Sequence, residues 1–568
     1  MEYLDTTQWP VGRLMEDFEQ GRIAIPEIQR DVVWDSDQVK ELVDSIFQNY
    51  PCGSLILWEP RLRDEKLMRE IIRPERLEYY NGRLPKYFLI DGQQRVTALA
   101  SVLLEQGFLK KVEPEIEEDL ACLYVNLRLF AKEVEKRNPN ITAIIEAATD
   151  GDQRPFPYAL MNDLFVGSIK DTSNYRDGLS RDQKRSIDLF TQRIRDYQFP
   201  VQVIQERDYP TAGKIFSRVN SQGTQLTGAE IHIASIIPHW RGIAAEFRKY
   251  RRDLRNGGYD LDLTFLMRAI TVIACDVPQI KKLADKVSQG NLTKRQLNRL
   301  WAESKRAINM VVRTLRDGLF LDKTKFFSSK NALVPLVYYG AKSHHRRMDH
   351  KAVMKYFLVS QLGGHYSGAA DTVLRRDLKY LSEPGTSPKQ GLRELLEVAV
   401  GEAKQEYRGL KVSHRHIAGV PSKNVMLLLM YIVMRRRKAS DFGLSRAQPL
   451  DQIPSPKLQL HHIFPFDFMM KDNKAKLYVE DQGITLRQFR DQVNDIANIT
   501  FLSREKNVQI GNVSPWQYLP NETTREMRKA HFIPEDKDLW RPENFDKFID
   551  RRRRMIAKAM NSLLRVLH

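Results

Sequence analysis

One short polar segment of the chain combines an acid, a glycine, two amides and an arginine: Asp91, Gly92, Gln93, Gln94 and Arg95. Apolar runs precede and follow it, and they predict a strand and then a buried helix. A strand, a glycine turn and a helix start direct backbone N–H groups and the positive end of the helix at an anion such as phosphate. We therefore expect Asp91 to position Mg²⁺ or water and Arg95 to neutralise phosphate oxygens. An ordinary exposed turn has the same pattern, so the segment alone does not decide between the two.

A second set of polar residues has the composition of a metal-dependent hydrolytic site: His461, His462, Asn498 and Asn507. Neighbouring side chains on a strand point to opposite sides, so one histidine could bind a metal while the other activates water. A neutral histidine, with an ordinary pKa of ~6.5, can take the proton from the attacking water. The oxygen of Asn507 is the ligand type that Mg²⁺ and Mn²⁺ prefer. This set predicts a nuclease site, although two structural histidines beside a strand have the same pattern.

The elements that must position these residues fall into three parts. Residues 1–240 alternate short strand-like and helix-like segments, whereas residues 241–440 carry apolar side chains at helical spacing. Residues 441–568 contain the histidine pair, and the prolines between Ser440 and Pro456 predict a linker into this third part. We therefore expect an α+β multidomain protein with an all-α central region.

Composition narrows the class of protein further. With 42% hydrophobic and 29% charged residues the chain is typical of a globular protein, and its net charge of +18 favours a polyanionic partner such as DNA or RNA. The three cysteines, Cys52, Cys122 and Cys275, are too far apart in sequence for a Cys-x-x-Cys zinc site and suit a reducing compartment. The first residues lack the features of a signal peptide, and the longest apolar run, 425–434, is too short to span a bilayer. These features predict a cytoplasmic protein with no membrane partner.

Further motifs accompany the segment Asp91–Arg95 in the first part of the chain. Gln29 and Arg30 precede it, and Phe216 and Asn220 follow it. In this order the motifs resemble those of the ParB-like, GmrSD-type NTPase domain of type IV restriction enzymes. The resemblance implies that Gln29, Arg30, Asn220 and the segment Asp91–Arg95 bind an NTP, such as GTP, with Mg²⁺. It also implies a catalytic role for Asp91 in NTP hydrolysis.

The second set resembles the HNH (ββα-metal) nuclease module that follows this type of NTPase domain. The resemblance implies that His462 is the general base and that His461 and Asn507 bind Mg²⁺ or Mn²⁺. Asn498 falls on the central asparagine of the motif, which holds the loop between the strands. The first metal ligand of the module is often an acid, and here it is His461, which could shift the metal preference.

The two resemblances together imply an NTP-regulated, metal-dependent endonuclease in antiviral defence. Its expected partners are double-stranded DNA, especially modified phage DNA, the nucleotide, and a second copy of the chain in a homodimer. Two alternatives stay open: a ParB-like, nucleotide-dependent DNA-binding regulator without cleavage, and an HNH nuclease that acts on RNA. Four basic segments are expected to supply some of the phosphate contacts: 247–252, 344–347, 435–438 and 551–554.

Overall fold

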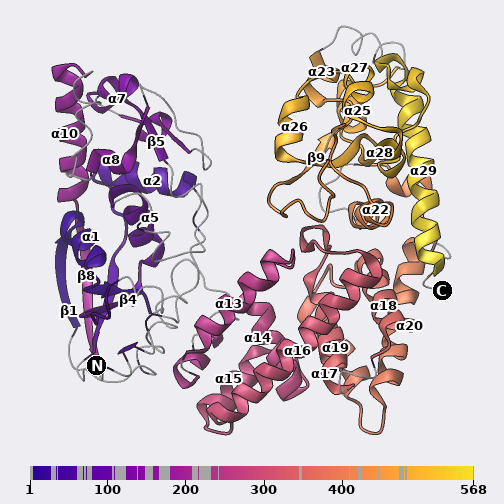
Figure 1. Cartoon of the computed structure of the whole chain (residues 1–568). Helices are drawn as coiled ribbons and strands as arrows, with labels where there is room; N and C mark the ends of the chain where they lie inside the picture. The colour runs from indigo at the N-terminus through magenta and orange to yellow at the C-terminus, as the bar shows by residue number, and fades with distance from the viewer. Residues whose placement is uncertain are drawn as a thin grey trace. The chain divides into compact units, whose positions relative to one another are not determined.

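The computed structural model shows a mixed α+β protein whose contacts divide it into two units (Figure 1). Unit 1 comprises Met1–Phe247 with Ala284–Lys294, and unit 2 comprises Arg248–Leu283 with Arg295–His568. Apart from a few single positions, the structure describes residues 4–26, 36–60, 80–104, 123–136, 139–147, 158–165, 179–206, 235–240, 242–343, 348–407, 410–419, 425–444, 447–471 and 483–566. Four expected site and motif residues, Gln29, Arg30, Phe216 and Asn220, and the basic segment 344–347 lie outside the described residues.

Unit 1 is built on a five-stranded mixed sheet with the strand order β1-β8-β3-β4-β2. β1 pairs antiparallel with β8, β8 parallel with β3, β3 antiparallel with β4, and β4 parallel with β2. The strands are β1 (Leu4–Pro10), β2 (Ile23–Ala24), β3 (Leu55–Pro60), β4 (Tyr87–Asp91) and β8 (Gln198–Glu206).

Helices of unit 1 pack on one another and on this sheet through their apolar faces. The helix that follows residue 35 shows this clearly: its apolar residues Val39, Leu42, Val43, Ile46 and Phe47 are all buried. Residues 158–165 form a short strand and a short helix, and the buried side chains of Ala159, Met161 and Phe165 pack into the core. The remaining elements are α1 (Val11–Glu19), α2 (Ser36–Phe47), α5 (Gln93–Leu103), α7 (Leu127–Val134), α8 (Met161–Phe165), α10 (Arg181–Asp196) and a small sheet of β5 (Leu123–Asn126), β6 (Ile145–Ala147) and β7 (Tyr158–Leu160).

Unit 2 begins with a helical part, as the apolar spacing predicts. The regular elements that the structure describes between 243 and 436 are all helical. Among the described residues no single helix is long and apolar enough to cross a membrane, and only the bent pair α14 and α15 meets that length and composition together. The main helices are α13 (Ile243–Asn256), α14 (Leu263–Cys275), α15 (Ile280–Ser288, shared with unit 1), α16 (Lys294–Leu319), α17 (Leu333–Lys342), α18 (His350–Leu362), α19 (Ala370–Ser382), α20 (Pro388–Glu406), α21 (His414–Ile417) and α22 (Val425–Arg436).

The last part of unit 2 contains two antiparallel strands followed by a helix. β9 (Leu458–His462) pairs with β10 (Ile499–Ser503), and His462 faces Ile499 in the register. An aromatic core that includes Phe464, Phe489 and Trp540 packs beneath them. The helices are α23 (Phe466–Lys471), α25 (Leu486–Val493), α26 (Arg504–Ile510), α27 (Pro515–Glu522), α28 (Arg525–Ala530) and α29 (Phe545–Val566).

Part of the stretch 440–456, which was predicted to be a linker, packs against the strands. The Asp441 carboxylate is buried and accepts hydrogen bonds from the backbone N–H and the hydroxyl of Ser503. Phe326 from the helical part packs against both Tyr431 and Phe501, with ring centroids 4.7 and 5.1 Å away. The helical part and β10 therefore share one packed region. A domain division at residues 240 and 440 stays a prediction.

Candidate functional site

The polar turn of unit 1 joins the last residue of β4 to the first turn of α5. Gly92 is the N-cap of α5 and adopts a φ of +96°, a conformation that side chains rarely allow. A Cβ at this position would also collide with the side chain of Leu55. The turn thus depends on glycine, and it places Asp91 and Arg95 beside the positive end of a helix of 11 residues.

Arg95 is anchored within this turn by two oxygen atoms. Its Nη2 lies 3.3 Å from Asp91 Oδ2, and its Nη1 donates to the carbonyl oxygen of Cys52 at 2.7 Å. The neighbouring Gln94 accepts a hydrogen bond from the backbone N–H of Trp34 at 3.3 Å, whereas Gln93 is buried. The structure therefore brings Asp91 and Arg95 together and links them to the loop before β3.

His461 lies on the face of β9 that is covered by α26 and α27. Its Nδ1 is 2.7 Å from Asn507 Oδ1, and its Nε2 is 3.3 Å from the hydroxyl of Tyr518. Asn507 Nδ2 in turn donates to Gln459 Oε1 at 2.8 Å, which fixes the orientation of the Asn507 amide. Burial lowers the pKa of His461 to about 4, so its imidazole is neutral near pH 7.

His462 has different partners from His461, as the alternation along a strand requires. Its Nε2 lies 3.0 Å from Asn494 Oδ1, at the C-terminal end of α25. Burial lowers the pKa of His462, and the hydrogen bond to Asn494 opposes that shift without cancelling it. A neutral imidazole that uses one nitrogen in a hydrogen bond can accept a proton on its other nitrogen.

Asn498 is fully buried and connects the end of β9 to the start of β10. Its Nδ2 donates to the carbonyl oxygens of Phe464 and Val493 at 2.9 and 2.8 Å, and its Oδ1 accepts from Phe464 N–H at 2.9 Å. These three bonds hold the segment that follows His462. The role of Asn498 in a nuclease motif stays a prediction.

Three residues of this region were missed by sequence reasoning: Gln459, Asn494 and Tyr518. Gln459 carried one usable signal, because it lies two residues before His461 and so shares its strand face. Asn494 and Tyr518 reach the histidines from helices 32 and 57 positions away. Local sequence patterns cannot predict contacts between residues this far apart in the chain.

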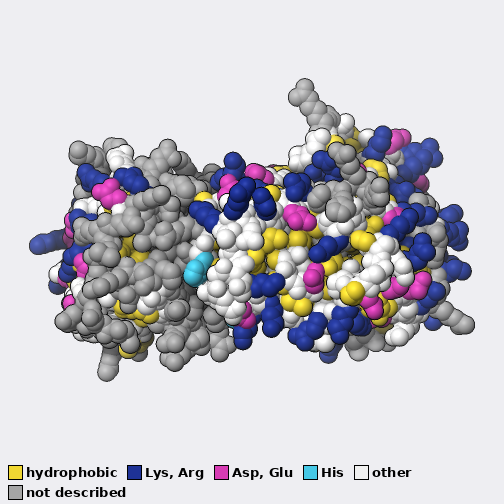
Figure 2. Space-filling model, turned by 90° about the horizontal axis from the view of Figure 1, so that it is seen from below, with side chains coloured by type: hydrophobic (Ala, Val, Ile, Leu, Met, Phe, Trp, Pro, Cys, Tyr) yellow, Lys and Arg dark blue, Asp and Glu magenta, His cyan; other side chains and the backbone are white. Residues whose placement is uncertain are grey.

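The basic segments differ in what they can offer to DNA. In the segment 551–554, Arg552 is fully buried and donates to the carbonyl oxygens of Ala497, Ile499 and His531, so it is unavailable to a phosphate. Burial lowers the pKa of Arg552 to about 9. Figure 2 shows other Lys and Arg side chains distributed over the described surface of one face, with Asp and Glu among them, and they do not form a single stripe there.

Comparison with known proteins gives a family match and one distant relative. Residues 11–237 match the family described as GmrSD restriction endonuclease, N-terminal domain. The chain is also similar to the uncharacterized protein MJ0686 of Methanocaldococcus jannaschii, with 21% identity over 600 residues that cover 96% of this chain and 97% of that protein. The family match includes the turn at Asp91–Arg95 and ends before the histidine pair.

Proposed function

We propose that the chain is an NTP-regulated, metal-dependent endonuclease that cuts modified phage DNA, because its residues 11–237 match the N-terminal domain family of GmrSD restriction endonucleases. The C-terminal residues around His462 cut the DNA, and the turn at Asp91–Arg95 binds the nucleotide. The observation that carries the proposal is the pairing of each histidine with an asparagine, His462 with Asn494 and His461 with Asn507.

His462 acts as the general base through Nδ1. Asn494 directs its Oδ1 at His462, since its Nδ2 donates to the carbonyl of Arg490 at 3.1 Å. An amide oxygen only accepts, so His462 Nε2 carries the proton and Nδ1 carries the lone pair. Nδ1 takes a proton from water as the water oxygen bonds to phosphorus and the bond from phosphorus to the 3′ oxygen breaks. The released 3′ oxygen takes a proton from solvent.

His461 and Asn507 fit a divalent metal. As the chain stands, His461 Nδ1–H donates to Asn507 Oδ1 at 2.7 Å, because an amide oxygen only accepts. A divalent metal held by these two atoms would take the place of that proton, and the remaining imidazole proton would lie on Nε2, where the hydroxyl of Tyr518 can accept it. When bound, Mg²⁺ or Mn²⁺ supplies stabilisation of the negative charge on the phosphate and on the leaving oxygen. The described residues include no group of three His, Cys, Asp or Glu that could hold a metal, so an ion bound by His461 and Asn507 would take its other ligands from water and from the phosphate.

Arg95 supports nucleotide binding at the other site. A guanidinium has five N–H donors, so its bonds to Asp91 and Cys52 leave donors for phosphate oxygens. Asp91 is about one-third exposed and sits at the start of α5, where a nucleotide-bound Mg²⁺ would find a carboxylate. A nucleotide that prefers one of two conformations of the protein would then control the nuclease.

The test is DNA cleavage by the full chain. Plasmid DNA and modified phage DNA are incubated with Mg²⁺ or Mn²⁺, with and without each NTP, alongside His462→Ala and Asp91→Ala. We expect His462→Ala to lose strand cleavage and to keep NTP hydrolysis, whereas Asp91→Ala loses NTP hydrolysis. His414→Ala, which changes an exposed histidine of α21, serves as the matched control.

The outcomes separate the alternatives. Cleavage by His462→Ala at the parent rate would reject the C-terminal site. DNA retention that depends on nucleotide, without any strand break by the parent, would favour a DNA-binding regulator. Cleavage of RNA in preference to DNA would identify an RNA nuclease.

A further inference from the structure

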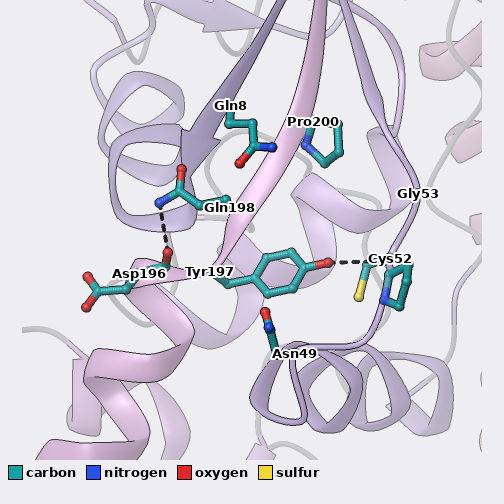
Figure 3. A pocket seen from close by; sticks show the side chains of 9 residues that line it. Gln8, Asn49, Cys52, Gly53, Asp196, Tyr197, Gln198 and Pro200 are labelled. Atoms are coloured by element: carbon teal, nitrogen blue, oxygen red, sulfur yellow. Dashed lines mark hydrogen bonds between the residues drawn. The ribbon is translucent and has the colours of Figure 1, made fainter.

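A cavity of about 500 Å³ lies in unit 1 where β1 ends and β8 begins (Figure 3). We infer that this cavity binds the base of the nucleotide whose phosphates are held at the turn Asp91–Arg95. This inference rests on the nucleotide binding proposed above and adds the residues that select the base. The volume lies within the range of small-molecule sites.

The wall of the cavity presents side-chain amides from the exposed face of two paired strands. Gln8 faces Pro200 in the register of β1 and β8, and Gln198 lies two residues before Pro200, so all three project from the same face. Asn49 adds a third amide from the end of α2. Among the described residues the amides of Gln8 and Asn49 have no hydrogen-bond partner.

These groups suit a nucleobase. A side-chain amide both donates and accepts, which matches the alternating donors and acceptors on a base edge. The ring of Pro200 and the ring of Pro51 add flat apolar surface for the base itself. A lipid chain would leave these amides without partners, and a divalent metal ion would use only their oxygens and leave their N–H donors without partners.

The loop between Asn49 and Gly53 is already held in place. Asn49 and Gly53 have φ values of +57° and +78°, and the hydroxyl of Tyr197 accepts from Cys52 N–H at 3.1 Å and donates to the carbonyl of Tyr50 at 2.8 Å. Figure 3 shows the Tyr197 ring reaching across the cavity toward Cys52. A rigid loop reduces the entropy that ligand binding must overcome.

The same loop joins the cavity to the phosphate turn. Cys52 offers its N–H to Tyr197 on the cavity side and its carbonyl oxygen to Arg95. Asp91 pairs with Ile56 near the start of β3, and Leu55 pairs with Val201 near the start of β8, so the turn and the cavity lie at one end of the sheet. Two strand spacings separate β4 from β8, about 10 Å. A nucleotide spans such a distance from its base to its outer phosphates.

The test compares ligands with and without a base. Calorimetry of the full chain with Mg²⁺ measures the Kd of each non-hydrolysable NTP analogue and of inorganic tripolyphosphate. Gln8→Leu and Gln198→Leu should each weaken binding of the preferred NTP by roughly tenfold and leave tripolyphosphate binding unchanged. Gln202→Leu is the matched control, because Gln202 shares the face of Gln198 on β8 and does not line the cavity.

Three results would overturn the inference. Parent-like NTP binding by both variants would remove the base from this cavity and leave the proposed nucleotide regulation intact. Equal losses for NTP and tripolyphosphate would mean that the variants act on the phosphate turn. If the parent binds neither ligand, the nucleotide part of the proposed function fails as well. Selective NTP loss in Gln8→Leu and Gln198→Leu, with the control unchanged, would support it.

Discussion

His462 and Asn494 are joined by a hydrogen bond that determines which imidazole nitrogen is basic. His462 Nε2 lies 3.0 Å from Asn494 Oδ1, and the amide of Asn494 is oriented by its own bond to the carbonyl of Arg490. The proton of the neutral imidazole must therefore lie on Nε2. Asn494 thus prepares Nδ1 to receive the proton of water, a positioning role.

Removing this acceptor should slow cleavage without weakening DNA binding. Asn494→Leu is expected to lower kcat roughly 100-fold at unchanged KM, because the neutral imidazole no longer favours the productive tautomer. Asn494→Asp keeps an oxygen acceptor and should retain most of the activity. Steady-state cleavage of a plasmid measures both constants.

Asn521 in α27 provides a control for the loss of a side-chain bond to the helix backbone. Asn521 makes the same kind of bond, from Nδ2 to the carbonyl four residues earlier, and has no histidine partner. Asn521→Leu should cleave as the parent does. A raised KM together with an equal fall in kcat for Asn494→Asp and Asn494→Leu would point to a purely structural role for Asn494.

Removing a metal ligand should be seen in the metal dependence of cleavage. His461→Ala and Asn507→Ala are each expected to raise the Mn²⁺ concentration for half-maximal activity by at least about tenfold. Activity assays over a Mn²⁺ series measure the shift. Gln509→Ala, an exposed change on the same helix as Asn507, is the control. A metal dependence equal to that of the control would reject the assignment of His461 and Asn507.

Removing Asn498 should destabilise the segment between the strands. In Asn498→Ala the N–H and carbonyl of Phe464 and the carbonyl of Val493 lose their side-chain partners in a buried place, at a cost of about 3 kcal/mol. Hydrogen exchange of β10 should therefore become faster, and cleavage should fall with it. Unchanged exchange rates in β10 would contradict this role.

Periodicity and motif spacing account for much of this arrangement. The apolar runs predicted the strand that ends at Asp91 and the helix after it, and alternation predicted that His461 and His462 have different partners. Local geometry decides such features, because neighbouring residues on one strand have fixed directions. The resemblance to the HNH module implied that His461 and Asn507 bind one metal, and the structure places these two side chains within hydrogen-bond distance.

Long-range packing determined what sequence reasoning could not provide. The run Arg551–Arg554 predicted an exposed basic face, yet Arg552 is buried because three carbonyl oxygens meet at its guanidinium. Those carbonyls come from Ala497, Ile499 and His531. These residues lie 21 to 55 positions before Arg552 in the sequence, so only the tertiary fold brings their carbonyls to one guanidinium.

Buried His531 should make the C-terminal part of unit 2 sensitive to acid. Burial lowers the pKa of His531 to about 4, so its proton uptake in the folded state requires a lower pH than in the unfolded chain. Between pH 6.5 and 4 the unfolded chain therefore binds more protons than the folded chain. The contribution of His531 to the free energy of unfolding is complete above this window and is lost as the pH falls through it. From pH 7.5 to 5.0 we expect a loss on the order of 2 kcal/mol from this group.

Hydrogen exchange at the two pH values, corrected for intrinsic rates, measures this loss in β10. His531→Gln keeps a neutral donor for the carbonyl of Ser440, the partner of Nε2 at 2.7 Å, and does not titrate. In His531→Gln the hydrogen-exchange protection of the β10 amides should depend less on pH than it does in the parent. Equal pH dependence in the two proteins would rule out His531 as the acid-sensitive group.

Gly53 should control the position of Arg95 through steric exclusion. A Cβ at Gly53 would collide with Arg95 Nη1, so Gly53→Ala must displace the guanidinium from Cys52 and from its place beside Asp91. We expect a loss of tripolyphosphate and NTP binding of at least roughly tenfold, measured by calorimetry.

The substitution also introduces backbone strain, because Gly53 has a φ of +78°. Gly290→Ala separates the two effects: Gly290 has a φ of +74° and no atom within 4 Å of its added Cβ. If Gly290→Ala loses as much binding as Gly53→Ala, strain in the backbone and not the position of Arg95 is responsible.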